Sequence, residues 1–485
     1  MRKYLGCVLV FSLLCGVVVA QEESSAPQVQ KLVAEADSAY MNKEYTRAIP
    51  LYLRASAYPE AEEWRWQILY NVNCCYSLLG NADSAFKYLD QSIKAGYTDY
   101  RWISRDTDFD FLRKNYPERF KDMISQALAA EKNEILTKSP IAVVEYDNYA
   151  GPVDISKYIW DDFHHPKIDT LRDRYKLPKI IEGGKTEFEK IRLLLDWVAN
   201  RWKHKGDNMA KERNALAILA AAEKGERFCC ANYADVLVNC MTALGYPARF
   251  VGLTKMGGAY GSSKGHGCVE VWSNQYQKWI LLDGQNNAWW ESKGVPLSAS
   301  ECRHLFVNGR EDEMSFVGQH KELDYPAMKR EWSVYFYHLR YSYNNSYFKT
   351  ISPGENLSFE LISDGVTPEL FSQGWPDNKS ITDDYEDAYP RLNQTKITLG
   401  HTNQNSPSDT LEVILTHTMP YFDKFMVRIN GSDWKESPDT FKWVLSKGEN
   451  TIEAKAVNLA GIGGRRSRIV LRNNIGATSK KSGVR

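Results

Sequence analysis

The pattern of apolar and polar positions divides the chain into a helical first part, a mixed middle part and a last part rich in strands. In the middle part, apolar residues at steps of three and four from Glu187 onward predict helices. Shorter apolar runs with turn residues between them then predict strands. The predicted helices are 187–202, 214–224 and 230–243, and the predicted strands are 249–253, 266–272 and 278–282. A turn at 273–276 would pair the last two strands.

From about Glu322 the apolar positions alternate with other residues, as they do in half-buried strands. Strand signals recur every ten residues or so toward the C-terminus, which favours one or two antiparallel β-sandwich modules. The alternating positions include Trp332, Val334 and Phe336, then Leu357, Phe359 and Leu361, and then Leu411, Val413 and Leu415.

The first part has small and aromatic residues at spacings similar to those of tetratricopeptide repeats. A first copy carries Ala36, Ala48, Tyr52 and Ala55, and a second, weaker copy follows from Asn73. Two copies are fewer than an independent solenoid needs, so the segment would be stabilised by packing against the adjacent part of the chain. A closing helix is expected from Asp106 to Phe120. The helices would form either a packing cap or a groove for a partner peptide.

These patterns predict a multidomain α+β protein. It would combine a helical repeat-like region, an α+β core and C-terminal antiparallel β-sandwich modules. The expected divisions are 1–20 as a signal peptide, 28–131 as the helical region, 132–320 as the core with a leading connector, 321–475 as the β modules and 476–485 as a disordered tail.

The N-terminus has the pattern of a secretory signal. Arg2 and Lys3 precede an apolar run from Leu5 to Val19, and Ala20 ends a small-residue cleavage site. The run is too short to predict an integral membrane span. Cys15 raises the alternative of a lipid anchor, but the residue before it is not small. We therefore expect an exported protein, periplasmic or secreted.

Composition excludes some partners. The chain has 61 basic and 61 acidic residues, so no net positive charge is available to hold nucleic acid. Its 14 Trp and 28 Tyr residues fill the cores or line a peptide or carbohydrate groove. Of nine cysteines, Cys7 and Cys15 lie in the leader, and the odd remainder favours an unpaired thiol after export. No Cys/His spacing indicates a structural metal, and no cofactor is expected.

Three polar residues carry the candidate chemistry. Cys230 opens a predicted helix, where unpaired backbone N–H groups favour a thiolate. His266 opens a predicted strand and can take up the thiol proton, and Asp283 ends the next strand and can orient the imidazole. Because the two strands are joined by a short turn, His266 and Asp283 are expected to be neighbours.

The order of these segments resembles the transglutaminase-like superfamily, relatives of the papain-like cysteine enzymes. The resemblance rests on Cys230 with Ala234, on Gly245-Tyr246-Pro247-Ala248-Arg249, on His266 and on Trp279 with Asp283. It covers roughly 185–310 and implies a Cys-His-Asp triad. The spacing selects Cys230 over Cys229, which would be a bystander. Phe228 and Cys268 replace a glycine and a tryptophan of the family pattern, and Cys268 would be either a packing thiol or a redox partner of Cys230.

Stabilising a tetrahedral intermediate needs hydrogen-bond donors. The backbone N–H of Cys230 is one candidate, and a second donor could come from Trp202 or His204. Both residues also have a purely structural interpretation, as a core ring and as a satisfied surface residue.

Two classes of function remain open. The first is an exported cysteine hydrolase or acyltransferase that acts on amides, with peptides as the leading substrate and a glycopeptide amidase as a variant. The second is a catalytically silent binding protein that kept the fold. Retention of Cys230, His266 and Asp283 favours the enzyme.

Overall fold

The computed structural model describes residues 26–256, 265–348, 358–361, 379–382, 385–401 and 409–475. The expected signal peptide, the C-terminal tail and Leu357 lie outside this described part. The chain divides into two compact units between Ala142 and Val143. No helix of the described residues is long and apolar enough to cross a membrane.

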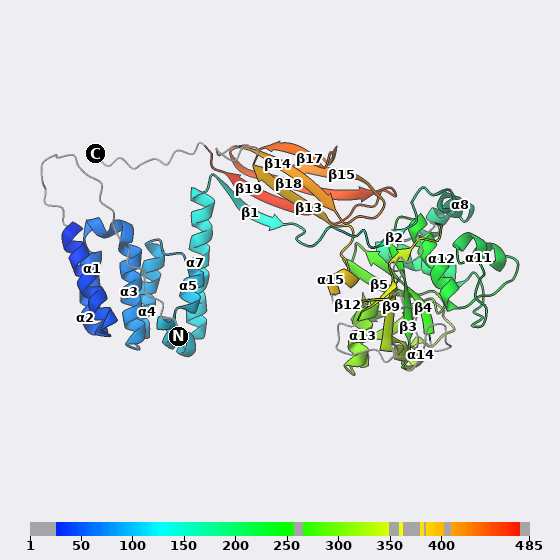
Figure 1. Ribbon diagram of the computed structural model, residues 1–485, viewed down its shortest axis with the longest axis horizontal. Helices are drawn as coiled ribbons and strands as arrows, with labels where there is room; N and C mark the ends of the chain where they lie inside the picture. Colours follow the sequence, from blue (N-terminus) through cyan, green and yellow to red (C-terminus); the bar gives the residue numbers. More distant parts are fainter. Residues whose placement is uncertain are drawn as a thin grey trace. The chain divides into compact units, whose positions relative to one another are not determined.

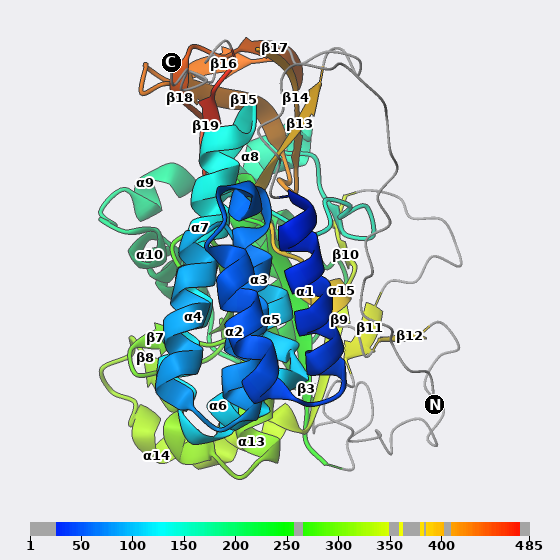
Figure 2. The same cartoon turned by 90° about the vertical axis from the view of Figure 1, so that its left-hand side faces the viewer.

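The first unit is an array of helices in which the first four α-helices pack against one another in chain order, and the last, long helix packs against the fourth, fifth and sixth (Figure 1, Figure 2). Buried alanines at the contact between α1 and α2 let the two helices approach closely. The described elements are α1 (Ala26–Met41), α2 (Tyr45–Ser56), η1 (Pro59–Trp64), α3 (Arg65–Leu78), α4 (Ala82–Lys94), α5 (Tyr100–Arg105), η2 (Thr107–Phe109), α6 (Asp110–Asn115) and α7 (Pro117–Lys138).

The single closing helix expected from Asp106 to Phe120 is wrong. The structure has two short helices there, and the long α7 begins only at Pro117. Tyr116 leaves the helical backbone with φ −136° and ψ 53°, and Pro117 then occupies a first-turn position of α7, where its missing N–H costs nothing.

The second unit is built around a mixed sheet with the strand order β12-β11-β9-β3-β4-β5-β6-β7, and β8 pairs with β6. Its central strands are antiparallel, and the turn expected at 273–276 joins β4 to β5. The strands are β3 (Ala248–Thr254), β4 (Gly265–Ser273), β5 (Lys278–Asp283), β6 (Ala288–Ser292), β7 (Val295–Pro296), β8 (Ser315–Gly318), β9 (His338–Ser342), β11 (Ser358–Leu361) and β12 (Lys379–Thr382).

Helices cover both faces of this sheet. On one face, Val269 and Val271 of β4 share a core with helix α12. On the other face, Cys268 and Trp272 share a core with α13. The helices of the first face are α8 (Pro166–Arg174), α9 (Leu177–Ile181), α10 (Glu187–Ala199), α11 (Ala215–Ala222) and α12 (Cys230–Ala243), and those after the central strands are α13 (Ala299–Val307), η3 (Glu311–Glu313), α14 (Tyr325–Ser333) and η4 (Val334–Tyr337).

Two antiparallel sheets follow toward the C-terminus (Figure 1). They meet at Thr395, whose hydroxyl accepts the Ala456 N–H and whose carbonyl accepts the Ser467 hydroxyl. One sheet has the order β1 (Ile141–Asp147), β19 (Ser467–Asn473), β18 (Gly448–Asn458), β15 (Phe422–Ile429) and β16 (Lys435–Ser437), and the other β13 (Thr395–His401), β14 (Thr410–His417) and β17 (Thr440–Val444).

Three small elements complete the description. Strands β2 (Ile159–Trp160) and β10 (Asn344–Asn345) form a separate parallel pair, and α15 is the short helix Tyr385–Ala388. The chain thus has N-terminal helices, an α+β core and C-terminal antiparallel sheets, as the sequence predicted.

The segment after residue 321 differs from the expected run of β-sandwich strands. The alternation at Trp332, Val334 and Phe336 forms no strand, because these residues lie in α14 and η4. Asp324 caps α14 by accepting the Ala327 N–H, and this local start signal outweighs the alternation. Strand β9, also from this range, pairs with β3 inside the core sheet.

Candidate active site

Cys230 is the first residue of α12, and Cys229 is the extended residue before it. The start of α12 lies directly over β4, because a Cβ at Gly267 would stand 2.9 Å from the Ala231 Cα. A glycine is therefore required at that point for the helix to approach the strand. The Cys230 thiol reaches the Gly267 backbone through a hydrogen bond. Cys230 is partly exposed, whereas the other cysteines of the described residues are buried.

His266 and Asp283 form a buried pair beside this helix start. The imidazole Nε2 lies 2.9 Å from the Asp283 Oδ2, and the two side chains are 4% and 5% exposed. The bond engages Nε2, so Nδ1 remains for a second partner. Asn286 also holds the carboxylate, since its backbone N–H donates to Oδ1 at 3.0 Å and its amide to Oδ2 at 2.8 Å.

The charge of Asp283 is stabilised by these contacts. Burial raises the pKa of the carboxyl group, but the charge and hydrogen bond of His266 lower it. The Asn286 donors also lower it, and the net pKa lies below its usual value. Asp283 therefore stays an acceptor that holds the imidazole in one orientation.

The two adjacent thiols are linked to each other. A hydrogen bond from Cys230, the largest effect, lowers the pKa of Cys229 to about 6, although burial opposes this. The same hydrogen bond and burial raise the pKa of Cys230. The two thiols therefore ionise in two steps: the first proton leaves at a lower pH than that of an ordinary thiol, and the second at a higher pH. Cys229 faces Met209 and Asn232, whereas Cys230 is the thiol that feels the charge of Asp283.

An aromatic cover that the sequence did not reveal lies on the imidazole. The rings of Trp332 and Tyr335 stand 4.6 Å and 5.6 Å from the His266 ring and stack on each other. The Lys255 ammonium lies over the Tyr335 ring, 4.3 Å from its centroid. The sequence did not predict this cover, because the alternation at Trp332, Val334 and Phe336 indicated a strand and these residues are helical.

The two candidate side-chain donors differ in availability. The indole Nε1 of Trp202 already donates to the Phe228 carbonyl at 3.2 Å, so the ring is a buried packing element. His204 is exposed, and partial burial followed by the charge of His266 lowers its pKa. Of the two side chains, His204 therefore remains the candidate donor, since no hydrogen bond of its ring competes with that role among the described residues.

Cys268 lies beside the dyad. Its sulfur, a ring nitrogen of His266 and a carboxylate oxygen of Asp283 all lie within 4.8 Å of one another. Burial is the main cause that raises the pKa of Cys268 well above its usual value, so it is a neutral thiol in the core. His266 and Cys268 are two residues apart on β4 and therefore share one face of the strand.

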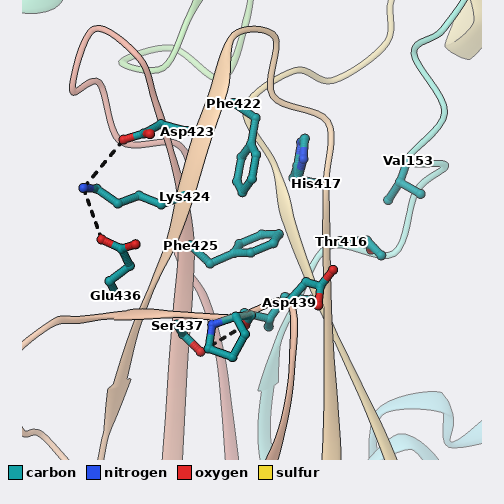
Figure 3. Close-up of a pocket in the computed structure, with 12 residues that line it drawn as sticks. Val153, Thr416, His417, Phe422, Asp423, Lys424, Phe425, Glu436, Ser437 and Asp439 are labelled. Atoms are coloured by element: carbon teal, nitrogen blue, oxygen red, sulfur yellow. Dashed lines mark hydrogen bonds and ion pairs between the residues drawn. The ribbon is translucent and has the colours of Figure 1, made fainter.

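A pocket of about 530 Å³ in the C-terminal sheets contains none of these groups (Figure 3). The His417 ring stacks on Phe422 there, with centroids 4.0 Å apart. Lys424 pairs with Asp423 and Glu436 at the rim. Lys424 is thus paired with two carboxylates and the His417 ring is packed against Phe422.

Comparison with known proteins agrees with the core assignment. Residues 175–284 match the family model of the transglutaminase-like superfamily, and this segment is thus a transglutaminase-like domain. The match includes Cys230, His266 and Asp283.

Two individual proteins share shorter or weaker similarity. A solved structure from Cytophaga hutchinsonii, named a "Putative Cysteine Protease", aligns at 16% identity over 39% of this chain and 57% of its own, with a TM-score of 0.22. At that score the likeness supports no inference. A chloroplastic protein of Arabidopsis thaliana is 41% identical over 46 residues, which are 10% of this chain and 14% of that protein. The chain spans less than two thirds of either relative.

Proposed function

We propose that this protein is an exported cysteine-dependent amide hydrolase or acyltransferase with Cys230, His266 and Asp283 as its triad. The observation that carries the proposal is the His266–Asp283 bond of 2.9 Å next to the helix start that presents Cys230. The transglutaminase-like match over 175–284 supports a cysteine enzyme of this type.

The chemistry follows from the roles of the three groups. Cys230 transfers its proton to Nδ1 of His266 and attacks the amide carbonyl carbon. The imidazolium then protonates the leaving amine as the C–N bond breaks, which leaves an acyl-thioester. Water or a primary amine attacks that thioester, gives its proton to His266 and releases the thiol. Asp283 keeps Nε2 engaged throughout, and the Cys230 N–H and His204 are the proposed oxyanion donors.

Peptides are the proposed substrates, and water is the proposed acceptor. Amide chemistry at a cysteine triad requires a substrate carbonyl, and peptide bonds supply one. The leader pattern at 1–20 supports export, which would place the enzyme where nutrient or cell-wall peptides occur. Glycopeptides are the alternative substrate within the same chemistry.

We also propose that the helical unit is tetratricopeptide-like and that it binds a partner peptide. The buried small residues Ala36, Ala48 and Ala55 support the repeat-like helix packing, and a packing cap is the alternative to the peptide groove. The catalytic unit should extend past residue 320, because β9 pairs with β3.

A thiol-directed electrophile tests the triad without a known substrate. At neutral pH, limited iodoacetamide should label Cys230 first, as read by peptide mass analysis, because Cys229 is buried away from the reagent although its pKa is the lower of the two. His266→Ala and Asp283→Asn should slow that labelling, whereas His304→Ala, an exposed histidine of α13, should not. Slow labelling of Cys230 that none of these changes alters would support the silent binding protein.

The reaction itself is distinguished by product masses. A peptide amide alone, the same peptide amide together with a fluorescent primary amine, and an Asn-linked glycopeptide are each offered to the wild type and to Cys230→Ala. Hydrolysis adds one water, transamidation adds the amine with loss of ammonia, and deglycosylation removes the sugar. A product that forms equally with Cys230→Ala would overturn the proposal.

A further inference from the structure

The buried thiol of Cys268 has no role in the proposed reaction, yet it stands at the dyad. The register of β4 and β5 explains its place. Val269 pairs with Leu282, so the next residues, Cys268 and Asp283, are opposite one another. His266 lies two residues earlier on the same face of β4. Donor atoms of the three side chains lie within 4.8 Å of one another, and the residues are 6%, 2% and 3% exposed in the order His266, Cys268, Asp283.

We propose that His266, Cys268 and Asp283 form a binding site for a thiophilic divalent cation of the zinc type, and that the bound cation switches the dyad off. Imidazole nitrogen, thiolate sulfur and carboxylate oxygen are the donors that zinc takes in proteins. Calcium and magnesium require oxygen donors, so the set is selective for softer metals.

The resting geometry needs little change to accept the cation. A tetrahedral zinc with bonds of about 2.0 Å to nitrogen and oxygen separates these two atoms by about 3.3 Å. The Nε2 of His266 and the Oδ2 of Asp283 are 2.9 Å apart. The cation would replace the proton between them, and the pair would widen by a few tenths of an ångström. Cys268 would lose its thiol proton as the metal–sulfur bond forms, and a water or Cys230 would complete the coordination.

An outer layer of contacts already holds the donors in place. Asn286 donates twice to the Asp283 carboxylate, and its own carbonyl accepts the Tyr325 hydroxyl at 2.8 Å. Hydrogen bonds of this kind fix the direction of ligating carboxylates in metal sites. The rings of Trp332 and Tyr335 pack against the imidazole and limit its movement.

Metal binding would stop the reaction because the cation would replace the hydrogen bond between His266 and Asp283 that orients the imidazole. The imidazole would then be held by the metal and Asp283 would no longer direct it toward Cys230. This inhibitory consequence rests on the proposed function, whereas the binding of the metal does not. The two can therefore be tested separately.

Cobalt(II) is the probe for binding, because thiolate-bound cobalt absorbs in the near ultraviolet and visible range. The full-length protein is titrated without oxygen or chelators, alongside Cys268→Ala and the matched control Cys302→Ala, another buried thiol that lies outside the donor set. Wild type and Cys302→Ala should give the thiolate bands, and Cys268→Ala should bind at least about 100-fold more weakly.

Two results would overturn the site: no bands in the wild type at saturating cobalt, or the same bands in Cys268→Ala. Circular dichroism confirms that each variant is folded, and Cys268→Val replaces the alanine variant if the cavity unfolds it. Retained bands in a folded Cys268→Val would also count against the site.

Inhibition is read from the alkylation of Cys230 with and without zinc. Zinc should slow alkylation at least about tenfold in the wild type and in Cys302→Ala, but not in Cys268→Ala. Equal slowing in Cys268→Ala would mean that zinc inhibits without Cys268, and would overturn the inhibitory role. If the metal-free wild type shows no fast alkylation, the proposed function fails while the cobalt result still decides the metal site.

Discussion

The indole of Trp332 lies 4.6 Å from the imidazole of His266, ring centre to ring centre. Trp332 comes from α14, outside the segment 175–284 that matches the transglutaminase-like family. A helix from later in the chain therefore supplies one wall of the candidate active site. The imidazole is held between this wall and Asp283.

Trp332→Ala should slow the alkylation of Cys230. An aromatic contact of this kind stabilises by about 0.5–1.5 kcal/mol, which corresponds to about a two- to tenfold change in rate. Trp332→Phe keeps a ring and should retain most of the rate. Trp434→Ala, at the residue just before β16, is the matched control. Identical rates for the alanine and phenylalanine variants would argue against a role for the ring.

Gly267→Ala should separate Cys230 from the dyad. The new Cβ would meet the Ala231 Cα at 2.9 Å and the Ala231 N at 3.2 Å, and backbone atoms cannot move aside. The start of α12 would shift by about an ångström, a displacement that can cost about 100-fold in rate. Alkylation of Cys230 measures the effect, and Gly183→Ala, with nothing within 4 Å of its Cβ, is the control. A folded Gly267→Ala variant with the wild-type rate would contradict this geometry.

Glu270→Ala should destabilise the core by about 3–5 kcal/mol. The Arg249–Glu270 pair is fully buried, with the Nη2 of Arg249 2.7 Å from the Oε2 of Glu270. The rings of Trp279 and Tyr341 surround the guanidinium, so the variant leaves a buried charge without its counterion. Urea denaturation followed by tryptophan fluorescence measures the loss.

The control for this stability measurement is Glu313→Ala. Glu313 pairs with Arg310 on the surface, and both side chains are about half exposed. Solvent screens such pairs, so the denaturation midpoint should hardly move. A similar shift in both variants would show that burial does not set the cost.

Cys229→Ala should move the alkylation of Cys230 to lower pH. The hydrogen bond with Cys229 is the largest cause that raises the pKa of Cys230. Its removal lowers that pKa, so the thiolate appears at lower pH than in the wild type. The pH dependence of iodoacetamide labelling, resolved by mass analysis for each cysteine, checks this. An upward shift of the midpoint would mean that Cys229 assists the ionisation of Cys230.

Local patterns predicted the centre of the fold well. The helix expected at 230–243 has the observed bounds of α12, Cys230–Ala243. The strands expected at 266–272 and 278–282 lie within β4 and β5. Strong helical periodicity and a short turn between two apolar runs act over a few residues, so they can be read from the chain without tertiary information.

Contacts between distant segments could not be predicted in this way. Nothing local shows that β9 would join β3, or that Trp332 would reach His266. The sequence also could not show that the indole N–H of Trp202 is already engaged, because its acceptor is the carbonyl of Phe228, a residue distant in the sequence. Such pairings depend on which surfaces meet after the elements have formed.

The neighbouring positions of β1 and β19 set an order of events for folding. Glu145 and Asp147 of β1 form ion pairs with Arg468 and Arg465, at or beside β19. During synthesis β1 emerges long before its partner, with the whole transglutaminase-like domain between them. The edge of β1 stays unpaired until β19 has been synthesised. Pairing two strands so far apart in the sequence is slow, because a long loop must close first. A nascent chain halted before Ser467 would leave β1 without this partner, and chaperones would have to protect it.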